Sequence, residues 1–104
     1  MPNVRILRQA SEEAEAAAAW YEAERRGLGT EFADALEYGI ELIEEDLFPL
    51  TPMPGASGSR GAKRLILRRF PYDIITIQRD DEIIIVAFAH HSRRPGYWRD
   101  RMPR

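Results

Sequence analysis

Residues 90–101 gather the side chains of this 104-residue chain that are best suited to chemistry on an anionic group. Guanidinium groups make planar, bidentate contacts with phosphate and carboxylate, while imidazole and phenol groups can accept or donate protons. The stretch therefore predicts a contact with phosphate, nucleic acid or an acidic partner. The residues concerned are His90, His91, Arg93, Arg94, Tyr97, Trp98, Arg99 and Arg101.

Cleavage of RNA by its own 2′-hydroxyl is one reaction that such a set of side chains could support. Attack on the phosphorus needs a proton acceptor, a proton donor and positive charge beside the pentavalent phosphate. Binding without catalysis is the other interpretation, and we favour it because any basic segment with aromatic residues would qualify. If the site is catalytic, its candidate residues are His90, His91, Arg93, Arg94 and Tyr97.

The two histidines do not predict a metal site. His90 and His91 are adjacent in a predicted strand, so their side chains point to opposite faces of the sheet. The sequence contains no other histidine, no cysteine and no glycine-rich phosphate loop. We therefore expect neither a metal nor a cofactor.

Length and composition indicate a single soluble, cytoplasmic domain over residues 1–104. The length suits one modest core, and the absence of cysteine removes any disulfide framework. The longest apolar run is far too short to cross a bilayer, and no signal-peptide hydrophobic region is present at the N-terminus, so we expect no membrane association.

The net charge of −2 conceals an uneven distribution of charged residues. Residues 1–54 carry 12 acidic and 4 basic side chains, whereas residues 55–104 carry 5 acidic and 11 basic ones. This asymmetry is consistent with an electrostatic binding surface. It is equally consistent with acidic helices that pair with a basic sheet inside one fold.

The spacing of apolar residues predicts the element order β-α-α-β-β-β. Ser11, followed by two glutamates, is predicted to cap the first helix, and Gly27 is predicted to end it. Pro49 prevents the second helix from continuing. The predicted strands are residues 3–8, 62–69, 72–79 and 83–90, the predicted helices are residues 12–26 and 30–47, and residues 48–61 are a predicted loop.

The predicted fold is an α+β domain in which a helical hairpin packs on one face of a curved, mainly antiparallel sheet. The last strand is apolar on both faces, so we expect it in the interior of the sheet. Alternation assigns a strongly apolar set to the face that the helices cover. That set is Val4, Ile6, Leu65, Leu67, Ile75 and Ile77.

The opposite face of the sheet is predicted to be a groove with an apolar floor and arginines at its edges. Two helices cannot cover both faces, and an exposed apolar patch with a charged rim usually marks a partner site. The alternative is that residues 97–102 fold back and fill the groove. The residues assigned to this face are Arg5, Leu7, Arg64, Ile66, Arg68, Tyr72 and Ile74.

Four sequence motifs resemble those of the RelE/ParE superfamily, the toxin components of bacterial type II toxin–antitoxin modules, also called plasmid-stabilisation proteins. The resemblance spans nearly the whole chain, and its motifs occur in the family's order. They are Trp20-Tyr21-Glu22, Gly27-Leu28-Gly29 with Phe32, Arg69-Phe70-Pro71-Tyr72, and the run from Ala89 to Trp98 with Arg101.

The resemblance implies a toxin whose sheet groove is wrapped by a segment of a cognate antitoxin, in a toxin–antitoxin hetero-oligomer. The predicted antitoxin contacts are therefore the residues of the uncovered face named above, from Arg5 to Ile74. The resemblance further implies growth inhibition through a cellular target. The predicted target contacts are Arg93, Arg94, Tyr97, Trp98, Arg99 and Arg101.

The superfamily divides by target. RelE-like members cleave mRNA in the ribosome, whereas ParE-like members inhibit DNA gyrase and need no catalytic centre. The isoelectric point of about 5.7 is a poor match to a surface that must enter ribosomal RNA, so we favour the ParE-like branch and DNA gyrase. The alternatives are a ribosome-dependent mRNA endoribonuclease and a non-toxic family member that retains antitoxin binding.

Overall fold

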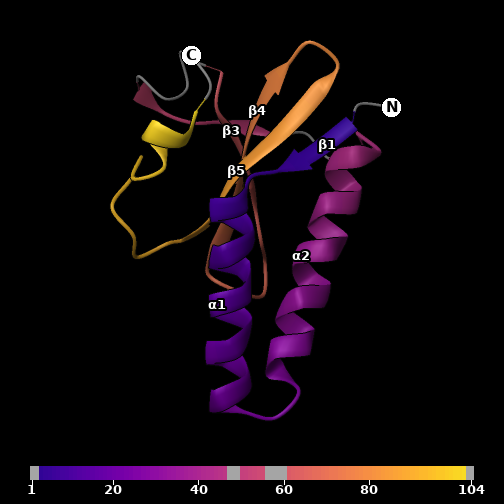
Figure 1. Cartoon of the computed structure of the whole chain (residues 1–104), viewed down its shortest axis with the longest axis vertical. Helices are drawn as coiled ribbons and strands as arrows, with labels where there is room; N and C mark the ends of the chain where they lie inside the picture. The colour runs from indigo at the N-terminus through magenta and orange to yellow at the C-terminus, as the bar shows by residue number, and fades with distance from the viewer. Residues whose placement is uncertain (1–2, 47–49, 56–60, 103–104) are drawn as a thin grey trace.

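The computed structural model describes residues 3–46, 50–55 and 61–102. Within these residues, two long helices and a five-stranded sheet form the fold (Figure 1). The helices are α1 (Arg8–Glu24) and α2 (Leu28–Glu44), and Arg99–Arg101 form a 3₁₀ turn. The strands are β1 (Asn3–Ile6), β2 (Thr51–Pro52), β3 (Lys63–Ile66), β4 (Tyr72–Arg79) and β5 (Glu82–His90).

The sheet is mixed but mainly antiparallel, with the strand order β1-β5-β4-β3-β2. β1 pairs in parallel with β5, and every other neighbouring pair is antiparallel. β5 lies inside the sheet, which confirms the prediction from its two apolar faces. The two-residue strand β2 was not predicted, because it falls within the segment interpreted as a loop.

The first helix begins at Arg8, so the prediction that Ser11 caps it is wrong. The backbone N–H of Leu7 still donates to Ile85 O in the sheet, and the N–H of Ser11 donates to Leu7 O at 3.0 Å. The chain therefore passes directly from strand to helix. Ala10, which lies in the first turn of this earlier start, is completely buried.

The turn between the helices is held by the carboxylate of Glu22. It accepts hydrogen bonds from the backbone N–H groups of Gly27, at 3.0 and 3.1 Å, and Gly29, at 3.1 Å. Gly27 has the positive φ of 87° that glycine tolerates best. Because of this clamp, α2 begins at Leu28 rather than at residue 30; its predicted end at residue 47 lies outside the described residues.

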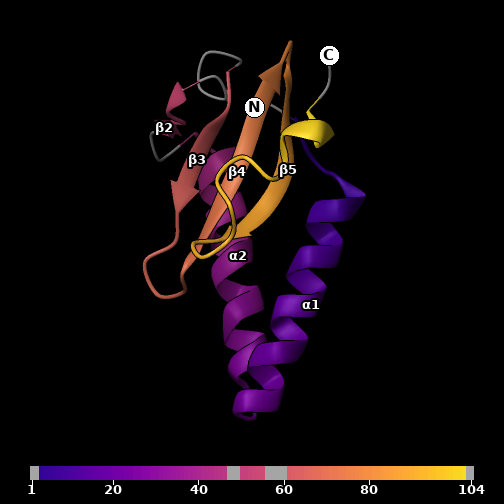
Figure 2. The ribbon, with the colours of Figure 1, turned by 90° about the vertical axis from the view of Figure 1, so that its left-hand side faces the viewer.

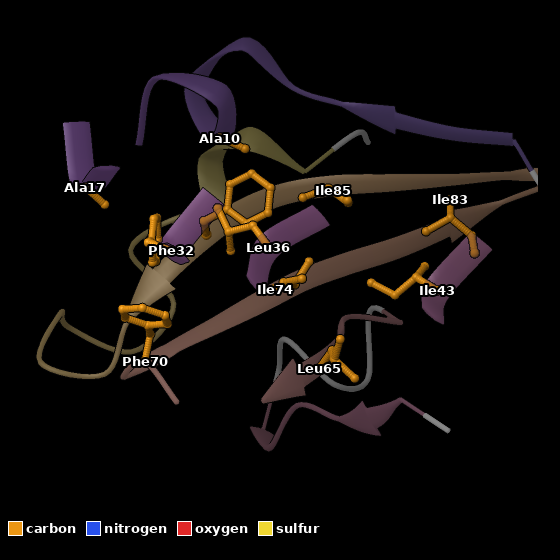
Figure 3. Close-up of a cluster of buried hydrophobic side chains, with 11 residues drawn as sticks. Ala10, Ala17, Phe32, Leu36, Ile43, Leu65, Phe70, Ile74, Ile83 and Ile85 are labelled. Atoms are coloured by element: carbon orange, nitrogen blue, oxygen red, sulfur yellow. The ribbon is translucent and has the colours of Figure 1, made fainter. Parts of the chain in front are cut away.

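The main core lies between the helices and the sheet (Figure 3). Ala10 and Ala17 of α1, with Ala14 and Tyr21 at its margin, face this core. Phe32 of α2 is fully buried among the aromatic rings of this core. The hairpin therefore covers one face of the sheet, as the sequence predicted.

The prediction of which β4 residues face the helices is wrong. Ile74 is fully buried in the main core and Tyr72 packs against it, whereas Ile75 and Ile77 lie on the opposite face. The register places Leu65 of β3 beside Ile74 rather than Ile75, and directly paired residues share a face. A difference of one residue in register turns every side chain of the strand over.

The C-terminal segment covers the central part of the second face. Trp98, only 2% exposed, and Met102 pack on Ile75, Ile84 and Val86. Figure 2 shows this segment crossing in front of β4 and β5, with α2 behind them. An open groove over the whole second face is therefore wrong, because the alternative of a folded-back tail applies over β4 and β5.

Strand β5 contains an irregularity that matters for the site. Ile75 of β4 pairs with Ala87, but its neighbour Thr76 pairs with Ile85, so Val86 has no partner on β4. An extra residue of this kind bends a strand and leaves backbone groups that need other hydrogen-bond partners. No helix among the described residues combines the length and apolar character needed to span a membrane.

Candidate functional site

The histidine–arginine segment follows directly from the end of β5. The N–H of His91 donates to Pro71 O at 2.8 Å, and the N–H of Arg93 donates to His90 O at 3.0 Å. A second turn follows, in which the N–H of Tyr97 donates to Arg94 O at 3.2 Å. These turns bring the candidate site residues of the segment 90–101 together beside the carboxyl ends of β5 and β3.

His90 is held as a hydrogen-bond acceptor through Nδ1. The backbone N–H of Ser92 donates to Nδ1 at 2.9 Å, and Ser92 Oγ lies 2.8 Å from the same atom. Because a backbone N–H can only donate, Nδ1 carries no hydrogen, and the neutral ring carries its hydrogen on Nε2. In this arrangement Nε2 of His90 is a hydrogen-bond donor. Nδ1 could act as a general base only if both of its contacts with Ser92 were broken.

His91 is engaged elsewhere, by Asp73. His91 Nε2 lies 2.8 Å from Asp73 Oδ1, and Arg64 Nη1 lies 3.5 Å from Asp73 Oδ2. Asp73 is only 8% exposed, so this carboxylate is a largely buried acceptor between an imidazole and a guanidinium. The two histidines thus bind separate partners, as their adjacency predicted.

Tyr97 donates its phenolic hydrogen to Glu13 Oε2. Burial is the largest cause that raises the pKa of Tyr97 far above its usual range, and the hydrogen bond to Glu13 raises it further. Arg101 binds the same carboxylate from the other side, with 2.9 Å between Nη1 and Oε1 and 3.2 Å between Nη2 and Oε2. Tyr97 is therefore a fixed structural donor.

The Glu13–Tyr97–Arg101 cluster also closes the exposed edge of β5. Strand β1 pairs with β5 only as far as Ile85. Beyond that point Arg101 Nη1 donates to Val86 O at 3.1 Å, and Phe88 N–H donates to Glu13 Oε1 at 3.2 Å. The side chains of Arg101 and Glu13 thus provide hydrogen-bond partners for backbone groups of β5 that neither the short β1 nor the irregular pairing with β4 satisfies.

The predicted target residues separate into an inner and an outer group. Trp98 lies in the second core and Arg101 in the cluster with Glu13, so both serve structure. Arg93 lies over the Tyr97 ring, 3.9 Å from its centroid, and Arg94 is exposed. Arg99 is exposed and folds against Gly96.

The predicted antitoxin residues do not form one surface. Tyr72 and Ile74 lie in the core beneath the helices, and Leu7 packs at the margin of the second core. Arg5 lies on β1, at the opposite end of the strand order from β2, and its Nη2 is 3.2 Å from Glu82 Oε1. Arg64, Ile66 and Arg68 gather around β3.

Two clefts meet at Ile66, which is 48% exposed. The first, which we call the arginine pocket, has a volume of 270 Å³ and lies between β3 and the segment after β5. The second, the α2–β3 groove, has a volume of 410 Å³. The arginine pocket is lined by Met53, Arg64, Ile66, Asp73, Ile75, Ala89 and residues 90, 91 and 93–98, and the groove by Ala35, Tyr38, Gly39, Leu42, Leu65, Ile66, Leu67, Arg68 and Arg69.

A third cleft, of 370 Å³, lies between α1 and the segment after β5. Trp20, 60% exposed, lies at this cleft together with His90, Arg93 and Tyr97. We call it the Trp20 cleft. Trp20 belongs to the Trp20-Tyr21-Glu22 motif, but its exposure was not predicted.

Two site residues had no signal in the sequence. Glu13 was interpreted as part of a solvated acidic face, because its partners lie 84 and 88 positions away. Tyr38, 63% exposed in the α2–β3 groove, was not among the predicted site residues. A motif search detects neighbours in sequence, and these contacts depend on the tertiary fold.

Comparison with solved structures identifies a shared fold. The chain matches one from "Chromosomal ParDE TA system from P. aeruginosa" with a TM-score of 0.73 and 15% identity, covering 86% of this chain and 96% of that chain. No protein-family model and no curated protein sequence matches. The structural match confirms the RelE/ParE-like fold that the motifs implied.

Proposed function

We propose that this protein is a type II toxin of the ParE-like branch, which inhibits DNA gyrase by binding and is neutralised by a cognate antitoxin in the cytoplasm. The observation that carries the proposal is the fold it shares with a chain of the ParDE system over nearly the whole of that chain. The family motifs, in the same order along this sequence, support it further.

Binding, rather than catalysis, is supported by the state of the proton-carrying side chains. His90 accepts from Ser92, His91 lies against Asp73, and Tyr97 donates to Glu13. A nuclease would need at least one of them free to accept a proton from a hydroxyl. Each is instead part of a contact that holds the C-terminal segment in place.

The antitoxin surface is best supported around β3. Strand β2 pairs only with Lys63 and Arg64, so Leu65 and Ile66 have no outer strand partner among the described residues. Exposed apolar side chains lie beside this edge, at Ile66 and at Tyr38 across the groove. An extended segment can pair with such an edge while its side chains enter the two adjoining clefts.

The target surface is best supported at the Trp20 cleft. An exposed tryptophan beside an arginine is the combination most enriched at the centres of protein interfaces. Arg93 is held over Tyr97 by a cation–π contact, so it approaches a partner with little loss of side-chain freedom. Trp20 and Tyr38 lie on different helices and line different clefts, which allows the two surfaces to be tested separately.

A DNA supercoiling assay with purified gyrase tests the proposal. We expect the purified protein to inhibit supercoiling and Trp20→Ala to weaken inhibition about tenfold or more, as for loss of a hot-spot residue. Tyr38→Ala is the matched control, since it removes an equally exposed aromatic residue from the other cleft. Unchanged gyrase activity at a large molar excess of folded protein would reject the gyrase target.

A ribosome-dependent endoribonuclease is the second candidate, because Arg93 and the exposed Arg94 flank the imidazole of His90 at one cleft edge. Primer extension on cellular mRNA after induction would then show cleavage that Arg94→Ala abolishes. Normal growth after induction without antitoxin, with folded protein present, would instead identify a non-toxic member that retains antitoxin binding.

A further inference from the structure

Arg64 is a partly buried cation whose hydrogen-bonding capacity is only partly used. Its Nη1 lies 3.5 Å from Asp73 Oδ2, an ion-pair distance longer than an ordinary hydrogen bond. Its Nε is buried and has no hydrogen-bond acceptor among the described residues. An unpaired buried donor costs free energy, so a better acceptor placed here would be bound favourably.

Asp73 would not be left unpaired if Arg64 turned to another acceptor. Its second oxygen, Oδ1, already lies 2.8 Å from His91 Nε2. Asp73 therefore keeps its contact with His91, which follows β5, when Arg64 of β3 leaves Oδ2. Arg64 can therefore exchange one carboxylate for another while Asp73 keeps its contact with His91.

The charge of the arginine pocket favours an incoming anion. Arg64, Arg93 and Arg94 all line it, and Asp73 is the one acidic residue of the lining. The guanidinium of Arg94 has no hydrogen bond or ion pair within residues 3–46, 50–55 and 61–102. The lining thus carries more positive charge than the described side chains neutralise.

The size and floor of the pocket favour part of a polypeptide over a free small molecule. Its 270 Å³ lies just below the range of about 300–1,000 Å³ typical of small-molecule sites. Met53, Ile66 and Ile75 give it an apolar floor. At Ile66 it continues into the α2–β3 groove, whose other lining residues are mostly apolar. A peptide with an apolar side chain beside its carboxylate can use both the cations and this apolar lining, whereas a nucleic-acid backbone has no apolar group to place along it.

We propose that the arginine pocket receives an aspartate or glutamate side chain of the antitoxin, with an adjacent apolar side chain of the same segment lying on Met53 and Ile66. The carboxylate accepts from Arg64 Nε and from Arg94, and Asp73 remains with His91. This inference rests on the proposed antitoxin surface around β3 and specifies the chemistry of the segment that occupies it.

Two short probe peptides test the inference in the absence of the antitoxin: acetyl-Leu-Glu-Leu-amide and its glutamine counterpart. Each is titrated into the ¹⁵N-labelled protein, with the backbone amides and the Arg64 Nε–H resonance followed by NMR. We expect the glutamate peptide to bind at least fivefold more tightly and to shift the Arg64 Nε–H resonance. Arg64→Lys, which keeps the charge but lacks this donor, should remove the preference, whereas Arg26→Gln on the helical turn should preserve it.

The outcomes separate this inference from the function on which it rests. Equal binding of both peptides at β3 without a shift of Arg64 Nε–H would overturn the carboxylate site and leave the antitoxin surface standing. A shift produced by inorganic phosphate or oligouridylate, but not by the glutamate peptide, would assign the pocket to nucleic acid and overturn the peptide occupant. Because wild-type resonances give the main readout, an unfolded variant would not obscure the result.

Discussion

Glu13 and Arg101, 88 positions apart in the sequence, form an ion pair with 2.9 Å between Oε1 and Nη1. Burial is the largest single influence and acts to lower the pKa of Arg101, but the hydrogen bond to Glu13 and the nearby charges, that of Glu13 first, together outweigh it and the pKa is raised. Arg101 therefore stays charged in its largely buried position. The pair ties α1 to the C-terminal turn and, through Val86 O, to β5.

Glu13→Gln should destabilise the protein by roughly 2–4 kcal/mol, because it leaves the buried Arg101 guanidinium without a charged acceptor. Urea denaturation followed by tryptophan fluorescence measures the change. Glu12→Gln is the matched control, an exposed neighbour on the same helix that should change stability by less than about 0.5 kcal/mol. Equal losses in the two variants would contradict the structural role of Glu13.

Stability should fall as the pH rises above about 10, the usual pKa of tyrosine. Folding raises the pKa of Tyr97, through burial first and Glu13 second. The unfolded chain then loses this proton at a lower pH than the folded protein, so increasing pH favours unfolding. Denaturation measured between about pH 9 and 11 should show that the free energy of unfolding falls less steeply with pH in Tyr97→Phe than in wild type. Identical slopes of this free energy against pH would refute the prediction.

Ile66→Asp should weaken antitoxin binding about tenfold or more, a change of roughly 1.4 kcal/mol or greater, because it places a charge between the two clefts. The side chain is half exposed, so stability should change little. Calorimetry with the proposed cognate antitoxin measures the affinity. Ile6→Asp alters another exposed isoleucine, on β1, and should leave binding intact. Loss of binding in both variants would point to a different surface.

Gly29→Ala should destabilise the helical hairpin by about 1–3 kcal/mol. A Cβ at this position would lie 2.5 Å from the carbonyl oxygen of Ala18, and backbone cannot yield as a flexible side chain can. Thermal unfolding measures the loss, and Thr30→Ala at the next, exposed position serves as the control. A melting temperature equal to that of the control would show that the helices separate freely.

The element order and the interior position of β5 could be predicted because their signals are local. The run from Ile83 to Ala89 is apolar at every position, and that pattern indicates a strand buried on both faces. The β4 strand was predicted with its observed bounds, but not its orientation. Isoleucines at positions 74, 75 and 77 make both faces of the strand apolar, so the sequence pattern does not show which face meets the helices. The pairing with β3 determines it.

The sequence predicted which residues come together at the candidate site, but not what each of them does there. Residues 90–101 do come together, yet Trp98 and Arg101 serve the fold and Arg93 and Arg94 remain at the surface. What separates these roles is Glu13, because its carboxylate captures Tyr97 and Arg101. A contact across more than 80 positions leaves no trace in the spacing of residues.

The parallel pairing of β1 with β5 has a consequence for synthesis on the ribosome. Asn3 lies beside Glu82 and Ile6 beside Ile85, so the first strand finds its neighbour only after most of the chain has been translated. Contacts between such distant positions have a high loop-closure cost and form late. A nascent chain therefore completes its sheet only after β5 has been translated, and the surfaces that depend on the segment after β5 are assembled last.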